Sequence, residues 1–197
     1  KPVEDGQDAE EEEMLMSVGL PLEPASVADL IAMSSKTRQM AEVVASIPQD
    51  DTMLVFSTSI PALYITQLVI NTAAPWRDVM HINYTIPPSA RPAIIKTWKA
   101  TPRAVLLSGT GVGGCGLNLV PLHNTGSGMW VLFCNATINS ASMEQARDRA
   151  YRLGQRRAVT VLYFSPLGTI QSWEGGWIKR NHDRIAAEAR SVLPELA

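Results

Sequence analysis

Residues 104–119 read AVLLSGTGVGGCGLNL, and this stretch decides the fold class. The continuous apolar run at its start is typical of a strand that is buried on both faces of a sheet. Five glycines follow the strand directly, and glycine lets backbone amides turn sharply and approach a ligand. In parallel α/β sheets, ligands bind at the carboxyl ends of the strands, where such turns lie.

Strand-like and helix-like patterns alternate on both sides of this stretch. Further apolar runs predict strands at residues 51–57 (DTMLVFS), 79–84 (VMHINY), 129–134 (MWVLFC) and 158–164 (AVTVLYF). Helical spacing predicts helices after Ser26, at residues 36–46, 60–73 and 88–100, and at 142–155 with a stop near Gly154. Strands that alternate with helices predict an α/β fold, with a doubly wound, mainly parallel sheet and helices on both faces.

Bulk composition excludes several classes of protein. The formal net charge is -2, so no global basic field marks a nucleic-acid binder. The two cysteines, Cys115 and Cys134, and the three histidines show no metal-binding spacing, which favours buried free thiols in a reducing compartment and no metal site. There is no signal-peptide pattern and no apolar run of about 18 residues, so we expect a soluble intracellular protein.

Five arginines crowd into residues 144–157, EQARDRAYRLGQRR. On a helix, Gln145, Arg149 and Arg152 would share one face, because they are spaced by four and three residues. This pattern has two interpretations. The arginines form a solvated stripe that pairs with neighbouring carboxylates, or they present planar, permanently charged forks to phosphate.

The glycine-rich turn also has two interpretations. GTGVGG, residues 109–114, satisfies the G-x-G-x-x-G pattern, but no acidic ribose partner follows about twenty residues later, and the chain has no G-K-[ST] sequence. The turn is therefore either an anion-binding loop or a sharp connection that needs flexible residues.

Taken in order, these segments resemble the second RecA-like lobe of superfamily-two helicases, and within them the Swi/Snf-like ATPases. Residues 145–155, QARDRAYRLGQ, match that family's motif VI at every fixed position, and residues 111–119 are similar to its motif V. Asn139 matches the asparagine of the family's W-N-P-A segment. Weaker similarities lie at residues 34–44, 53–57 and 158–173, so the resemblance covers residues 34–173.

The sequence departs from the family pattern at several points. Gly109, Thr110 and Gly111 stand where Ser-Thr-Arg or Ser-Thr-Lys is usual, and Tyr84-Thr85 where Gly-Ser or Gly-Thr is usual. Ile138 replaces the usual tryptophan, and Gln171 the usual glutamate. These departures favour an alternative, a degenerate and inactive lobe that acts as an interaction or regulatory module.

The resemblance implies half of an ATPase site. A first lobe, on the same parent chain, would bind most of ATP and Mg²⁺, and this lobe would supply arginines across the cleft. The implied arginine fingers are Arg149 and Arg152. The implied nucleotide-binding residues are Gly114, Gly116, Asn118, Gln145 and Gln155, and the implied nucleic-acid-binding residues are Thr110, Gly113 and Asn139. The implied partners are that first lobe and duplex DNA or chromatin, and the implied location is the nucleus.

We expect three segments: an acidic tail or linker at residues 1–25, the RecA-like lobe at 26–174, and a helical extension at 175–197. We expect the chain alone to be inactive as an ATPase. A third hypothesis, an unrelated nucleotide-binding α/β enzyme, would need a catalytic base or nucleophile, and the sequence shows no such constellation.

Overall fold

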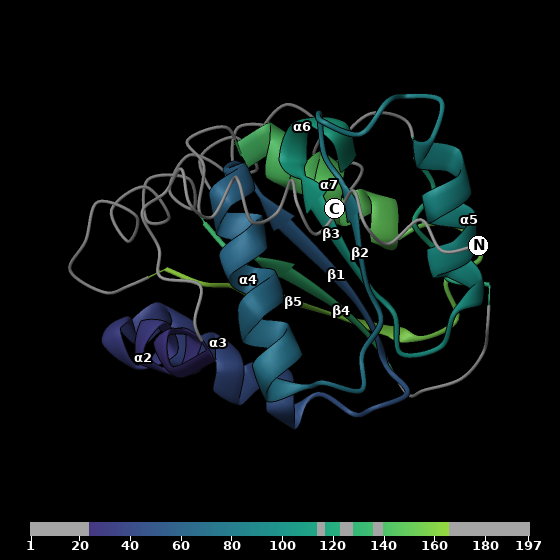
Figure 1. The fold of residues 1–197 in the computed structure, drawn as a ribbon. Helices are drawn as coiled ribbons and strands as arrows, with labels where there is room; N and C mark the ends of the chain where they lie inside the picture. The colour runs from purple at the N-terminus through teal and green to yellow at the C-terminus, as the bar shows by residue number, and fades with distance from the viewer. Residues whose placement is uncertain (1–23, 114–116, 123–127, 136–139, 166–197) are drawn as a thin grey trace, which may run out of the picture.

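The chain forms a five-stranded, fully parallel sheet with helices on both faces (Figure 1). The computed structural model describes residues 24–113, 117–122, 128–135 and 140–165. The strand order is β2-β3-β1-β4-β5, with β1 in the centre. The predicted doubly wound α/β fold is therefore confirmed.

The strands coincide closely with the predicted apolar runs. They are β1 (Thr52–Ser57), β2 (Val79–Ile82), β3 (Val105–Gly109), β4 (Gly128–Phe133) and β5 (Ala158–Tyr163). The described helices are α2 (Pro24–Met33), α3 (Ser35–Ser46), α4 (Ile60–Ala73), α5 (Arg91–Ala100), α6 (Thr110–Gly113) and α7 (Ser140–Ala150).

Local sequence signals explain where several helices begin. Ser34 is the N-cap of α3, and its hydroxyl accepts a hydrogen bond from the backbone N–H of Thr37 at 3.5 Å. Prolines stand in the first turns of α4 and α5, where the missing N–H would have had no helical partner. The short helix α6 was not predicted, since four residues of which two are glycine give no periodic pattern.

Two hydrophobic clusters flank the sheet. On one face α3 and α4 pack through residues such as Met40, Val44 and Leu63. On the other face α5 and α7 pack through Trp98 and Ala146 and their neighbours. All six residues of β1 are buried, as expected for the central strand of a sheet covered on both sides. The sheet therefore positions its carboxyl-end loops on a rigid base.

A buried charged network fixes the amino-terminal edge of the sheet. Asp51 is 1% exposed, and its carboxylate accepts hydrogen bonds from the backbone N–H of Gly128 at 2.8 Å and from the indole N–H of Trp130 at 2.9 Å. Arg77, also buried, donates to the carbonyl oxygens of Asp51 and Pro48, both at 2.8 Å. The network ties the start of β1 to the start of β4.

The prediction of a buried free thiol is confirmed for Cys134, which is 2% exposed. Its Sγ lies 3.2 Å from the hydroxyl of Thr66. Burial raises the pKa of the Cys134 thiol to about 11, so the group is an unreactive part of the core. Cys115, predicted to be similar, lies outside the described residues.

His81 on β2 is partly buried between neighbouring side chains. Its Nε2 contacts the side-chain oxygen of Gln67, and its ring stacks on Tyr64 with the ring centroids 5.2 Å apart. Burial lowers the pKa of His81 from 6.5 to about 4. Protonation of the His81 ring is therefore less favourable in the folded protein than in the unfolded chain.

We expect the free energy of unfolding to fall between pH 6.5 and pH 4, because only the unfolded chain takes up a proton on His81 in this window. Below pH 4 both states are protonated, and this contribution ends. The shift corresponds to at most about 3 kcal/mol. Urea unfolding at pH 7 and at pH 4.5 measures the loss, and His81→Phe, which keeps a ring against Tyr64, should remove that part of it. An identical pH dependence in the variant would show that carboxylates alone cause the loss.

Candidate functional site

Helix α7 carries most of the arginine-rich segment, and one side of it is anchored in the core. Met143, Ala146 and Ala150 are buried against the sheet, while Gln145 and Asp148 are exposed. The spacing of the three buried residues by three and four is that of one helical face. The opposite side of α7 is thus free to present polar groups.

The predicted helix end is wrong by four residues. α7 ends at Ala150, and residues 151–154 form bends and turns. The reason is a side-chain cap: the amide nitrogen of Gln155 donates to the carbonyl oxygen of Ala150 at 3.3 Å. Gly154 follows with a φ of +99°, a conformation that glycine adopts without strain. Arg152 therefore lies just beyond the helix.

Gln155 is partly buried and links the end of α7 to β4. Besides Ala150, its amide nitrogen contacts the sulfur of Met129 at 3.2 Å. Its side-chain oxygen accepts a hydrogen bond from the backbone N–H of Arg157 at 3.2 Å. These contacts give Gln155 a structural task within the motif.

The arginines are not equivalent. Arg147 pairs with Asp148 at 3.0 Å on the surface, as one interpretation of the pattern predicted. Arg149 is half-buried in the last turn of α7, with its Nε buried. Arg152 and Arg156 are exposed. Arg149 and Arg152 therefore do not share one helical face as predicted. Arg149 is a half-buried residue of α7, and Arg152 is an exposed residue after the helix.

Arg157 belongs to the buried network at the edge of the sheet. Its guanidinium donates to the hydroxyl of Thr52 at 3.4 Å. Partial burial lowers the pKa of Arg157, and the nearby Asp51 carboxylate opposes that shift. This arginine acts in folding rather than at the surface.

The glycine-rich segment begins at the carboxyl end of β3, as predicted. Thr110, half-buried, starts α6, and Gly113 ends it. Asn118 is exposed, and its side-chain oxygen accepts a hydrogen bond from the backbone N–H of Val120 at 3.1 Å. Three further predicted residues lie outside the described part of the chain: Gly114, Gly116 and Asn139.

The structure brings the two motif-like segments together. The backbone N–H of Leu119 donates to the carbonyl oxygen of Arg149 at 3.1 Å. α6 also contacts α7. Asn118 and Arg149 are thus held by adjoining backbone, although about thirty residues separate them in the sequence. Gln145 lies on α7 with its side chain exposed.

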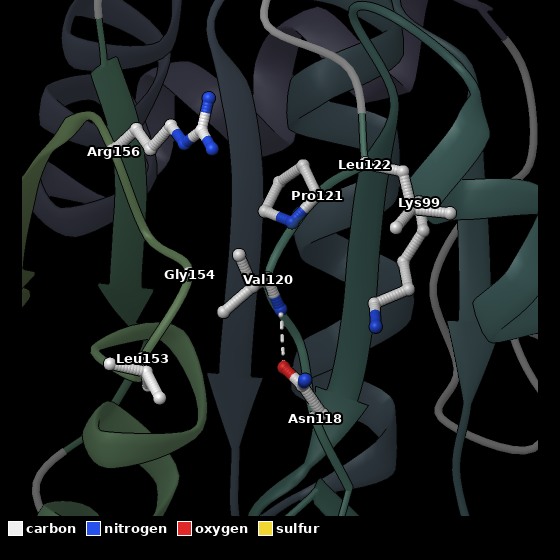
Figure 2. Close-up of a pocket in the computed structure, with 8 residues that line it drawn as sticks. All are labelled: Lys99, Asn118, Val120, Pro121, Leu122, Leu153, Gly154 and Arg156. Atoms are coloured by element: carbon white, nitrogen blue, oxygen red, sulfur yellow. Dashed lines mark hydrogen bonds between the residues drawn. The ribbon is translucent and has the colours of Figure 1, made fainter.

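An open pocket of about 360 Å³ lies beside this junction (Figure 2). Val120 and Pro121 run through its middle, with Lys99 and Leu122 on one side and Arg156 on the other. The backbone N–H of Leu122 donates to the carbonyl oxygen of Lys99 at 2.9 Å, which fixes that side. The remaining lining residues are Asn118, Leu153 and Gly154.

Sequence reasoning missed Lys99 and assigned no role to Arg156. Lys99 lies in the last turn of α5, and the sequence predicts only a core helix there. Lys99 and Asn118 line the same pocket because residues 117–122 pass beside the end of α5. No local sequence pattern predicts this tertiary contact.

The described residues contain neither a candidate metal site nor a candidate membrane span. In that part of the chain no three His, Cys, Asp or Glu side chains gather in a way that could hold a metal ion. Among the described helices, none has the length and apolar character needed to cross a membrane.

The fold resembles a solved ATPase fragment. The structure aligns with the C-terminal part of the Fun30 ATPase domain, with a TM-score of 0.64 and 22% sequence identity. The alignment covers 74% of this chain and 45% of that chain. The observed sheet is therefore that of a RecA-like lobe, as predicted.

Sequence relatives point in the same direction. The chain is 35% identical over 124 residues to the DNA excision repair protein ERCC-6-like 2 of Mus musculus, covering 62% of this chain and 8% of that protein. It is 36% identical over 84 residues to the chromatin-remodeling ATPase INO80 of Schizosaccharomyces pombe, covering 42% and 5%. With Switch 2 of Arabidopsis thaliana the identity is 28% over 138 residues, covering 69% and 15%. No protein-family model matches the chain.

The chain is therefore similar in sequence to parts of Swi/Snf-family ATPases, and its fold is similar to the C-terminal part of an ATPase domain. Each match spans only a small part of the relative's length, between 5% and 15% for these three proteins.

Proposed function

We propose that this chain is the second lobe of a Swi/Snf-like, DNA-dependent ATPase motor. In this proposal ATP and Mg²⁺ bind mainly to a first lobe, and this lobe supplies Arg149 and Arg152 across the cleft. The observation that carries the proposal is the junction between the motifs, where Leu119 is hydrogen-bonded to the backbone of Arg149. A nucleotide-dependent shift of α7 would therefore move the Asn118 segment with it.

The two arginines suit different parts of that task. Arg152 is exposed and follows a capped helix end, so its guanidinium can reach a partner lobe while its backbone stays fixed. Arg149 is half-buried and needs less ordering when it meets phosphate. Arginine suits this role because its planar fork donates two parallel hydrogen bonds to phosphate oxygens.

The remaining assignments are part of the same proposal. Gln145 and Gln155 hold motif VI in place near the nucleotide, and Gln155 already ties the end of α7 to β4. Gly114, Gly116 and Asn118 couple the nucleotide to the DNA groove, and the nucleic-acid contacts are assigned to Thr110, Gly113 and Asn139. We further propose that the protein acts in the nucleus and on chromatin, because relatives carry DNA-repair and chromatin-remodelling names. Residues 26–174 form the lobe, preceded by an acidic segment.

We expect the chain to bind duplex DNA weakly, with affinity that falls steeply between about 50 and 200 mM salt. Contacts between Lys or Arg and phosphate release bound counterions, and this produces the salt dependence. Fluorescence anisotropy with a labelled duplex of random sequence measures it. Thr110→Asp, which places a negative charge at the start of α6, should weaken binding, whereas Thr72→Asp on the exposed part of α4 should not. Affinity that does not change with salt would contradict phosphate contact.

A further inference from the structure

The polar side chains that line the pocket are hydrogen-bond donors. Lys99 and Arg156 are cations, and the side-chain oxygen of Asn118 is already occupied by the N–H of Val120, which leaves its amide nitrogen as a donor. No carboxylate lines the pocket, and within the described ranges neither Lys99 nor Arg156 forms an ion pair. Partial burial lowers the pKa of Lys99, as expected for an ammonium that has lost water without gaining a counter-charge. The complementary ligand is therefore an anion that accepts hydrogen bonds.

The rim of the pocket is apolar. Leu122 is 70% exposed and Leu153 is fully exposed, with Val120 and Pro121 buried between them. Figure 2 shows the two leucines on opposite sides of the pocket, and exposed large apolar side chains around a pocket are typical of an interaction site. A small anion alone would leave both leucines in water, so the best occupant carries carboxylates next to apolar side chains.

The chain itself contains such a segment. Residues 1–14 hold seven of its nineteen Asp and Glu residues but one of its seventeen Lys and Arg residues, so the remaining chain has a net charge of +4 against -2 for the whole. Four consecutive glutamates, Glu10 to Glu13, are followed directly by Met14, Leu15 and Met16. Carboxylates and flexible apolar side chains therefore occur in the order that the pocket requires.

We propose that residues 4–16, EDGQDAEEEEMLM, dock in this pocket of the same chain. The glutamates face Lys99 and Arg156, and the methionines and leucine cover Leu122 and Leu153. The fifteen residues from Glu10 to Pro24, where α2 begins, can span up to roughly 45–50 Å when extended. A domain of this size has a diameter of roughly 40 Å, so this span covers most of the path over the surface from one face of the sheet to the other.

Docking would cover Asn118 and screen the neighbouring arginine segment. The acidic segment would then compete with any phosphate that approaches this junction, and its tethering would give it a high local concentration. The inference stands independently of the proposed ATPase function, because it depends only on the pocket and on the charge distribution of the chain.

Photo-crosslinking on the whole 197-residue chain tests this inference. We replace Leu153 with the photoreactive residue p-benzoylphenylalanine, irradiate at low ionic strength and map the products by mass spectrometry. Crosslinks should fall within residues 4–16 of the same molecule. The double variant Lys99→Glu/Arg156→Glu should lower their yield about tenfold, as expected for two ion pairs turned into repulsions. The matched control Lys96→Glu/Arg38→Glu, at exposed positions outside the pocket, carries the same charge change and should leave the yield unchanged.

A second variant keeps the test valid if the first variant misfolds. Replacing Glu10 to Glu13 by glutamine changes no described residue and should lower the yield by a similar factor. The proposal is overturned if no crosslink reaches residues 4–16, or if the control variant lowers the yield equally. It is also overturned if mixed heavy-isotope and light-isotope chains crosslink mainly to each other. A different result would assign the pocket to phosphate instead. In that case the acidic segment would form no crosslink, and duplex DNA would prevent the probe at position 153 from reacting.

Discussion

Replacing Arg152 by alanine in a two-lobe enzyme is expected to lower ATP turnover by about 10³- to 10⁵-fold, the range that arginine fingers supply in phosphoryl transfer. The charge of Arg152 is needed when negative charge builds on the transferring phosphoryl group, so ATP affinity should change much less than turnover. Folding should be nearly unaffected, because the side chain is exposed and lies beyond the end of α7. DNA-stimulated ATPase rates and melting temperatures measure the two effects separately.

The other arginines supply the comparison. Arg149→Ala should also abolish turnover, but with some loss of stability, since its side chain is half-buried. Arg147→Ala removes a surface pair with Asp148 and should leave turnover near the wild-type rate. Arg152→Lys should restore little activity, because lysine keeps the charge and loses the fork. Equal, small effects at all three positions would favour the alternative of an inactive lobe that serves as an interaction module.

Replacing Asp51 by alanine is expected to lower the free energy of unfolding by about 3–5 kcal/mol. The N–H groups of Gly128 and Trp130 would lose a charged acceptor, and Arg77 would remain buried without a nearby negative charge. A loss of this size is a large part of the stability of an ordinary domain. Urea unfolding, followed by fluorescence or circular dichroism, measures it.

The neighbouring aspartate is a matched control for this substitution. Asp50 is exposed, so Asp50→Ala should change the free energy of unfolding by less than about 0.5 kcal/mol. Asp51→Asn, which keeps the shape and one acceptor oxygen, should fall between the two. Equal losses for Asp50→Ala and Asp51→Ala would mean that the network contributes nothing.

The sheet could be predicted from the sequence because its strands are buried on both faces. A strand such as β1 or β3 must then be a continuous apolar run, and such runs are visible without any tertiary information. Asp51 shows the limit of this reasoning. In the sequence it is one of two adjacent aspartates at the boundary of a strand, and only the approach of β4 shows that one is exposed and the other is buried.

The candidate site was predictable only in part, for a similar reason. Arg149 and Asn118 follow from motif resemblance, and their common backbone link is a tertiary contact. The end of α7 was misplaced because helical periodicity cannot detect that Gln155 caps Ala150. Lys99 lines the pocket through a tertiary contact between the end of α5 and residues 118–122, and no local sequence pattern predicts such a contact.

The central position of β1 also governs how this chain can be assembled. β1 is the first strand in the sequence, yet its two neighbours in the sheet are β3 and β4. During synthesis one edge of this mainly apolar, fully buried strand stays unpaired until residues 128–133 have emerged. An unpaired apolar edge is a template for aggregation. Expression fragments that stop before β4 should therefore be insoluble, and the ribosome must produce most of this lobe before its first strand is protected.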